Sequence, residues 1–321
     1  MDTASHSDHK SQFTAFLDTQ HRGEYDQQIR EMAKAADGRT SQRLLVSVND
    51  IRQFDPKLAT QLLRQPLRFL APWTEVVTER VQYATGKKNT SESETENEEE
   101  SASVACKMSN ENKTKIIIKG NLHTDILMRC YLKKEFNLLD GKRLSHIWHM
   151  TTPQLKKPLF ITDGALNVLP RIDIKLQILN NAVQFCNKLG IETPKVAILS
   201  GTEDPIDSMP SSVEAKKVME LSIEQKINAI VHGPLAFDNA VSIEAAKTKK
   251  IENEVAGKAD ILLVPNLETG NSLSKMMVYF MDACAAGIVI GGKIPVVVPS
   301  RADSKISKLA SIMAAVVAVK D

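Results

Sequence analysis

The chain contains 321 residues with a formal net charge of +2, 42% hydrophobic residues and 25% charged residues, which is an ordinary balance for a globular protein. The net charge argues neither for nor against a nucleic-acid partner, whereas an aromatic content of 5% disfavours a surface built for stacking bases. The four cysteines form no CxxC pair, the N-terminus lacks a signal sequence, and no apolar run is long enough to span a membrane. We therefore expect a soluble cytoplasmic protein with no disulfide framework, no zinc site and no membrane contact.

The first third of the chain has two compositions. Residues 13–83 place apolar side chains at helical spacing, with one strand-like piece at Leu44–Val48, and predict a small helical segment over residues 1–85. Residues 86–112 are rich in Glu and Ser. The Glu carboxylates repel one another and the segment can bury little apolar surface, so we expect an acidic disordered linker there. Residues 113–321 form a third region with a different pattern.

Short branched aliphatic runs alternate with helical patterns from residue 113 onward. The predicted strands are Lys115–Lys119, Leu159–Asp163, Val196–Ser200, Ala229–Val231, Ile261–Val264, Gly287–Ile290 and Val296–Val298. The predicted helices are residues 121–136, Ile172–Leu189, Ser211–Leu221, Asn239–Lys249, Ser272–Cys284 and Asp303–Val319. Such alternation predicts an α/β fold with a layered sheet flanked by helices on both faces.

Several common catalytic signatures are missing from the sequence. There is no GxGxxG dinucleotide fingerprint, no GxSxG nucleophile turn and no GxxxxGK[ST] phosphate loop. His146 and His149 are three residues apart on an apparent strand, where this spacing places the two rings on opposite faces. A metal site at these histidines is therefore disfavoured.

Polar residues instead follow the ends of several predicted strands, where open α/β sheets bind their ligands. One group surrounds a strand-to-helix turn with cations, a hydroxyl and helix amides, which suits a phosphate or a nucleotide tail. It consists of Lys119, Gly120, His123, Thr124 and Arg129. Gly270 lets the backbone approach closely, and Asn271 supplies an amide that both donates and accepts.

A second group, Ser300-Arg301-Ala302-Asp303, follows the last predicted strand. Arg301 can hold a phosphate with two parallel hydrogen bonds, and Ser300 can donate to a developing oxyanion. Asp303 either caps the following helix or accepts a proton, and the residues alone leave both roles open. Further polar residues at strand ends, expected at the same edge of the sheet, are Asp238, Asn239, Asn266 and Asn271.

Seven ordered blocks of residues 113–320 resemble the phosphate acetyl/butyryltransferase family. They are KGNLHTDILMR (119–129), GKRLSHIWHM (141–150), PLFITDGALNVLP (158–170), GIETPKVAILS (190–200), GPLAFDNAVS (233–242), VAGKADILLVPNLETGN (255–271) and SRADS (300–304). The resemblance implies transfer of a short acyl group between coenzyme A (CoA) and inorganic phosphate, with no metal and no permanently bound cofactor. It also implies a homo-oligomer with an isocitrate-dehydrogenase-like architecture. This chain lacks the usual N-terminal segment of the family, which predicts an exposed sheet edge at Ile116–Ile118.

The same resemblance implies roles for individual residues. Arg301 and Arg129 would hold phosphate, Ser300 would steady the thioester carbonyl or the departing thiolate, and Asp303 is a candidate for deprotonating the attacking phosphate. Gly270, Asn271 and Lys275 would lie along the CoA wall. The set implied for phosphate and CoA is Lys119, Gly120, His123, Thr124, Arg129, Gly233, Asp238, Asn239, Asn266, Gly270, Asn271 and Lys275, with Ser300, Arg301 and Asp303 as the catalytic group.

Residues Tyr25–Leu63, above all RLLVSVNDIRQFDPKLATQLL, resemble the start of the N-terminal domain of minichromosome maintenance (MCM) helicase subunits. Two alternatives to an active acyltransferase therefore stay open. One is a CoA-binding module without turnover. The other is a replication-associated protein whose partners are nucleic acid or replicative helicase subunits in the nucleus. A fusion of two unrelated fragments would also explain the two resemblances.

Overall fold

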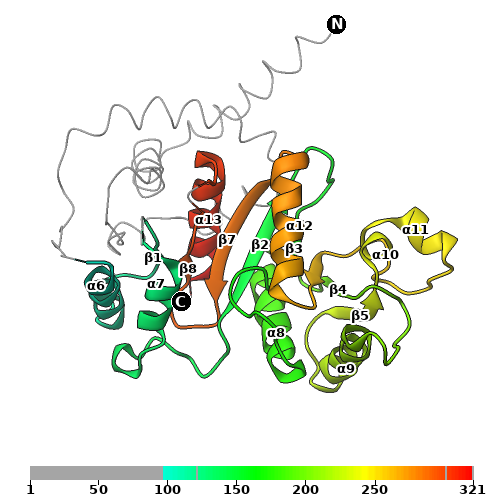
Figure 1. The fold of residues 1–321 in the computed structure, drawn as a ribbon, viewed down its shortest axis with the longest axis horizontal. Helices are drawn as coiled ribbons and strands as arrows, with labels where there is room; N and C mark the ends of the chain where they lie inside the picture. Colours follow the sequence, from blue (N-terminus) through cyan, green and yellow to red (C-terminus); the bar gives the residue numbers. More distant parts are fainter. Residues whose placement is uncertain (1–96, 121, 301, 320–321) are drawn as a thin grey trace, which may run out of the picture.

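A computed structural model of the chain describes residues 97–120, 122–300 and 302–319 (Figure 1). The helical segment predicted at residues 1–85 lies outside the described residues. The helices are α6 (Glu98–Asn110), α7 (Thr124–Tyr131), η2 (Lys134–Phe136, a 3-10 turn), α8 (Ile172–Lys188), α9 (Pro210–Glu224), α10 (Phe237–Val241), α11 (Ile243–Thr248), α12 (Leu267–Phe280) and α13 (Lys305–Ala318). The strands are β1 (Ile117–Ile118), β2 (Ser145–Thr151), β3 (Leu159–Thr162), β4 (Lys195–Leu199), β5 (Ile230–Leu235), β6 (Ile261–Leu263), β7 (Cys284–Ile290) and β8 (Val296–Val297).

The described strands form one eight-stranded mixed sheet in the order β1-β8-β7-β2-β3-β6-β4-β5. β1 pairs in parallel with β8, and β3, β6, β4 and β5 form a second parallel group. β7 and β2 lie between these groups and pair antiparallel with their neighbours. The predicted α/β sheet is therefore confirmed, and each predicted strand is present.

The antiparallel pairings reverse the strand direction across the sheet. β1, β8 and β2 run one way, whereas β7, β3, β6, β4 and β5 run the other way. The carboxyl ends of β1 and β8 therefore lie at one end of the sheet, and those of β5 and β6 lie at the opposite end. The prediction that all polar strand-end residues meet at one edge is wrong for this reason.

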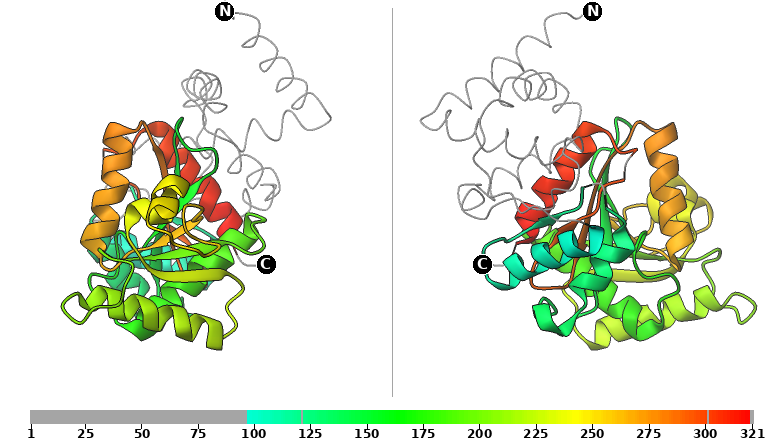
Figure 2. Two further views of the ribbon diagram at one scale, coloured as in Figure 1. Left: turned by 90° about the vertical axis from the view of Figure 1, so that its right-hand side faces the viewer. Right: turned by 60° about the vertical axis from the view of Figure 1, so that its left-hand side comes forward.

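Helices cover both faces of the sheet, as the sequence predicted. Successive side chains of a strand point to opposite faces, so Phe160 faces α8, α9 and α13 while Ile161 faces α10 and α12. Figure 2 shows α12 and α13 on opposite sides of the strands. A further apolar cluster, around Ile117, joins β1 and β8 to α6 and α7.

The two histidines of β2 lie on opposite faces, which confirms the prediction from their spacing. The His146 ring contacts Trp148 on the α12 face, and the His149 ring contacts Phe160 on the other face. Within the described ranges, no group of three or more His, Cys, Asp or Glu side chains is placed to hold a metal ion. The same ranges contain no helix with the length and hydropathy that crossing a membrane requires.

Residues 98–110 form helix α6, although the sequence predicted a disordered linker over residues 86–112. Asn97 caps this helix, because its side chain accepts a hydrogen bond from the backbone N–H of Glu100 at 2.9 Å. A stripe of small side chains on α6 is buried against α7 and β1; it consists of Ala102, Ala105 and Cys106. The linker prediction is wrong for this segment, since the buried stripe stabilises a helix despite the neighbouring Glu run.

The edge strand β1 is covered, although the sequence predicted an exposed edge at Ile116–Ile118. Ile117 is fully buried, and Ile118 is only 4% exposed. Helix α6 contributes to this cover, because its buried stripe belongs to the same apolar cluster as Ile117. The prediction of an exposed edge is therefore wrong.

The predicted helix Asn239–Lys249 is divided into α10 and α11. Ser242 separates them with extended backbone, and its hydroxyl accepts the N–H of Ala245 at 3.2 Å to cap α11. A serine cap inside the helical pattern therefore starts a new helix.

Gly287 of β7 gives a test of the packing on the α12 face. A Cβ at this position would lie 2.4 Å from Cζ3 of Trp148 and 2.9 Å from Nε2 of His146. We expect Gly287→Ala to lower the free energy of unfolding by about 1–3 kcal/mol in urea denaturation, because the partly buried Trp148 ring and the buried His146 ring would both have to shift. Gly201→Ala is the control, since its Cβ would meet only the flexible end of Met209, at 3.0 Å. Equal stability of Gly287→Ala and the native chain would contradict this packing.

Candidate functional site

The carboxyl ends of β1 and β8 lie side by side because these strands pair in parallel. The backbone N–H of Lys119 extends the pairing by donating to the carbonyl of Val297 at 2.9 Å. Two segments therefore leave the sheet together. One is the loop from Lys119 to Thr124, which leads into α7, and the other is the turn from Ser300 to Asp303, which leads into α13. The sequence predicted phosphate chemistry for both.

A reciprocal pair of hydrogen bonds closes the Ser300–Asp303 turn. Oδ2 of Asp303 accepts the N–H of Ser300 at 2.7 Å, and the N–H of Asp303 donates to the Ser300 carbonyl at 3.1 Å. The cap of α13 is Ser304, whose hydroxyl accepts the N–H of Ser307 at 3.1 Å. Asp303 therefore does not cap α13, and its carboxylate instead closes the turn; proton acceptance by Asp303 stays a prediction. The predicted phosphate ligand Arg301 lies outside the described residues.

Three lysines from different elements influence the Asp303 carboxyl group. Burial raises the pKa of Asp303, and Lys275, Lys308 and Lys119 each oppose part of this rise. Lys275 belongs to α12, Lys308 to α13, and Lys119 to the end of β1. A carboxyl group with a raised pKa can take up a proton more readily, while nearby ammonium groups attract an anion.

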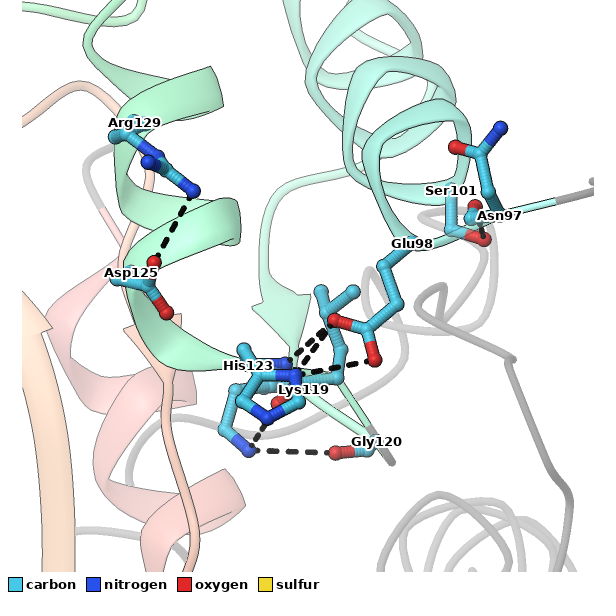
Figure 3. A network of polar contacts seen from close by, with 9 residues as sticks. Asn97, Glu98, Ser101, Lys119, Gly120, His123, Asp125 and Arg129 are labelled. Atoms are coloured by element: carbon cyan, nitrogen blue, oxygen red, sulfur yellow. Dashed lines mark hydrogen bonds and ion pairs between the residues drawn. The ribbon is translucent and has the colours of Figure 1, made fainter.

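Lys119 holds the loop that follows β1. The residue is 7% exposed, and its Nζ donates to the carbonyl of Leu122 at 2.8 Å and to that of Gly120 at 3.4 Å (Figure 3). Thr124 begins α7, and His123 occupies the N-cap position without a side-chain capping bond of its own. The predicted strand-to-helix turn is therefore present, with the ammonium of Lys119 engaged by the loop backbone.

Arg129 lies in the last turn of α7. Its guanidinium forms a 3.1 Å ion pair with Asp125, and both side chains are 68% exposed. Figure 3 places Arg129 further along α7 than His123. The described contacts of Arg129 thus join it to Asp125 and not to the Ser300–Asp303 turn.

The predicted residues at the start of α12 fix this helix to the loop after β3. Asn266 caps α12 by accepting the N–H of Thr269 at 2.9 Å. A Cβ on Gly270 would lie 2.8 Å from the Cα of Gly164, and Nδ2 of Asn271 donates to the Gly164 carbonyl at 3.3 Å. Gly270 therefore lets α12 approach the backbone of Gly164 closely, while its predicted role beside a ligand stays a prediction. Lys275 follows on the exposed side of α12, within electrostatic reach of Asp303.

Three predicted site residues belong to β5 and the helix after it. Gly233 lies within β5, whereas Asp238 and Asn239 lie in α10, at the opposite end of the sheet from Ser300. The Nδ2 of Asn239 donates to Glu203, and Lys249 lies 2.9 Å from Glu203 and 3.7 Å from Asp238. These contacts form a separate polar cluster, which the described interactions do not connect to the Ser300–Asp303 turn.

Three residues of this region, Asp163, Glu98 and Lys308, are not among the site residues predicted from the sequence. Asp163 is 2% exposed and accepts N–H hydrogen bonds of 2.6–3.0 Å that fix the loop beside Gly270. An Asp-Gly pair directly after a buried strand was the available signal. Glu98 contacts His123. Its helix could have been predicted from the capping residue Asn97, the acidic first turn and the stripe of small apolar residues that follows. Lys308 gave no signal in the sequence.

The fold is an α/β sheet in which the ends of two parallel strands bring the Lys119 loop beside the Ser300–Asp303 turn, with three lysines acting on the Asp303 carboxyl group. A family model described as phosphate acetyl/butaryl transferase matches residues 63–316. The chain therefore belongs to the phosphate acetyl/butyryltransferase family.

Proteins similar to this chain carry names from the same family. The chain is 40% identical to a phosphate acetyltransferase of Rhizobium meliloti over 208 residues, which covers 64% of this chain and 66% of the relative, just under two thirds. It is 41% identical to a phosphate butyryltransferase of Clostridium acetobutylicum over 216 residues, or 67% of this chain and 72% of that protein. The crystal structure of a branched-chain phosphotransacylase from Enterococcus faecalis superposes with a TM-score of 0.66 at 32% identity, covering 76% of this chain and 93% of that one.

A second family model, the MCM N-terminal domain, matches residues 10–111. This match includes the Tyr25–Leu63 stretch that carried the resemblance. It shares residues 63–111 with the transferase match. Of the shared segment, the structure describes residues 97–111, which contain α6.

The raised pKa of Asp303 predicts a pH dependence of stability. In the folded protein this carboxyl group keeps its proton at a pH where the unfolded chain has already lost it. Relative to Asp303→Asn, the native free energy of unfolding should therefore fall as pH rises from the ordinary pKa of 3.8 through the raised value. Urea titrations between about pH 3 and about pH 7 measure this difference.

Asp173 is the matched control, because a hydrogen bond from Arg171 lowers its pKa. The native chain should gain stability relative to Asp173→Asn as pH rises from the lowered pKa to the ordinary pKa of 3.8, and no further above it, which is the opposite sign at the acidic end of the range. A difference of the same sign for both substitutions would contradict the assignment at Asp303.

Proposed function

We propose that this protein transfers a short acyl group between CoA and inorganic phosphate, forming an acyl phosphate and free CoA. The observation that carries the proposal is the Ser300–Asp303 turn with Lys119, Lys275 and Lys308 near its carboxyl group, in a chain of this family. The names of the relatives, acetyl- and butyryltransferases acting with phosphate, support the same reaction class.

The reaction needs charge neutralisation and a proton acceptor. A phosphate oxygen attacks the thioester carbonyl carbon, a C–O bond forms, the C–S bond breaks, and the sulfur leaves as the CoA thiolate. Asp303 takes the proton lost by the attacking phosphate and later returns it to the sulfur, a role that its raised pKa favours. Lysine ammonium groups and Arg301 neutralise phosphate charge, and the Ser300 hydroxyl donates to the developing oxyanion.

Helix α12 is the proposed wall for CoA. Gly270 and Asn271 fix its first turn against Gly164, which keeps the exposed side of the helix in a constant position. Lys275 lies on that side and can pair with a phosphate of CoA. We place this reaction in the cytoplasm, where acyl-CoA is available.

A homo-oligomer is part of the same proposal. Tyr279 and Phe280 end α12 with 65% and 84% of their surface exposed. Neighbouring exposed aromatic side chains of this kind favour a protein–protein contact. A second copy of the chain is the partner we propose.

A thiol-release assay tests the proposed reaction. The purified full-length chain is mixed with acetyl-, propionyl- or butyryl-CoA and phosphate, and free thiol is followed over time. We expect turnover with at least one of these substrates. We expect a fall in kcat/KM of about 100-fold in both Ser300→Ala and Arg301→Ala, because each loses stabilisation of developing charge.

Arg171→Ala is the control for this assay. Arg171 forms an exposed pair with Asp173 beside α8, so its loss should leave turnover unchanged. Thiol release by a folded native chain that does not exceed that of Ser300→Ala would rule out the enzyme and favour a CoA-binding module.

A further inference from the structure

Glu98, at the start of α6, contacts the loop beside the Ser300–Asp303 turn. Its Oε2 lies 2.9 Å from Nδ1 of His123 and also accepts the backbone N–H of His123 at 3.1 Å (Figure 3). The two residues are 25 positions apart in the chain. The contact therefore joins two separate helices, α6 and α7.

The position of Glu98 is fixed by the packing of α6. The buried stripe of α6 lies against Leu127 of α7 and Ile117 of β1. The hydroxyl of Ser103 lies 3.5 Å from the sulfur of Cys130 on α7. Asn97 caps the turn on which Glu98 lies. The carboxylate is thus placed by a packed helix and not by a freely rotating chain end.

The chemistry of a carboxylate determines the state of the imidazole. An ionised Glu has no hydrogen to donate, so Nδ1 of His123 must carry the hydrogen in the bond to Glu98. The same carboxylate also accepts the backbone N–H of His123. This N–H is the first donor at the N-terminus of α7, a helix end that the His123 side chain does not cap. Nε2 then carries the lone pair of the ring and can accept a hydrogen bond from a ligand.

The loop that carries His123 is held from the other side by Lys119. Its ammonium donates to the carbonyls of Gly120 and Leu122, the residue directly before His123. Lys119 is also close enough to influence the pKa of Asp303. The imidazole is therefore part of a loop that two charged side chains fix beside the proposed acyl-transfer site.

We propose that Glu98 is a positioning residue for this site. It holds His123 in the Nδ1–H form, so that the lone pair of Nε2 can accept a hydrogen bond from the P–OH group of a protonated phosphate of the substrates. The proposal rests on the proposed function for the ligand, whereas the tautomer follows from the Glu98–His123 contact alone. The phosphate can belong to inorganic phosphate or to CoA, and the experiment separates these sources.

Kinetics of the full-length chain test the positioning role. We expect Glu98→Ala to raise KM about fivefold for the substrate that carries the bound phosphate, with kcat within about twofold of native, because a binding group loses its orientation. A rise in KM for inorganic phosphate assigns that source, and a rise for butyryl-CoA assigns the other. Glu98→Gln keeps one acceptor oxygen and should recover most of the effect.

Glu99→Ala is the matched control, because Glu99 is exposed on the same turn of α6. Its two KM values should equal those of the native chain. Unchanged KM values for both substrates in an active Glu98→Ala enzyme would overturn the proposal. An equal effect of Glu99→Ala would overturn it too, because the change in KM would then come from the negative charge of the first turn of α6 and not from the Glu98–His123 contact.

Nuclear magnetic resonance gives a measurement that does not depend on turnover. In the chain labelled with ¹⁵N-histidine, the His123 signal, assigned with His123→Asn, should show the Nδ1–H form when neutral. Glu98→Gln should keep this form, and Glu98→Ala should lose it. A native His123 in the Nε2–H form would overturn the proposal. If the native chain has no turnover, the proposed function fails while this spectrum still decides the Glu98–His123 contact.

Discussion

The parallel pairing of β1 with β8 is the constraint on which the site depends. Only two residues of each strand form the ladder, Ile117 with Val296 and Ile118 with Val297. Because the strands are parallel, their carboxyl ends lie together, and the Lys119 loop emerges beside the Ser300 turn. An antiparallel pairing would have placed these segments at opposite ends of the sheet.

Such a short edge pair needs support from the helices around it. Helices α6 and α7 bury their apolar sides on one face of β1 and β8, and α13 packs on the other face. Ile117 and Val296 are buried on the α6/α7 face, and Ile118 and Val297 are buried on the α13 face. Helix α6 thus has two effects, since its buried stripe covers the sheet edge and its first turn places Glu98 at His123.

Most of the fold could be predicted from the sequence, whereas the grouping of site residues could not. A run of branched aliphatic residues such as Val196–Ser200 is typical of a buried strand, so the positions of the strands could be predicted. Strand direction depends on pairings between distant segments. The sequence therefore could not separate Asp238 and Asn239 from Ser300. In α6, composition misled the prediction, because the Glu run obscured the helical spacing of Ala102, Ala105 and Cys106.

We place phosphate and CoA where β1 and β8 end. A crystal structure of the full-length chain grown with CoA and phosphate tests this placement. Phosphate should lie within hydrogen-bond distance of the Ser300–Asp303 turn, with CoA along α12. Both ligands bound instead beside Asp238 and Asn239, at the opposite end of the sheet, would contradict it.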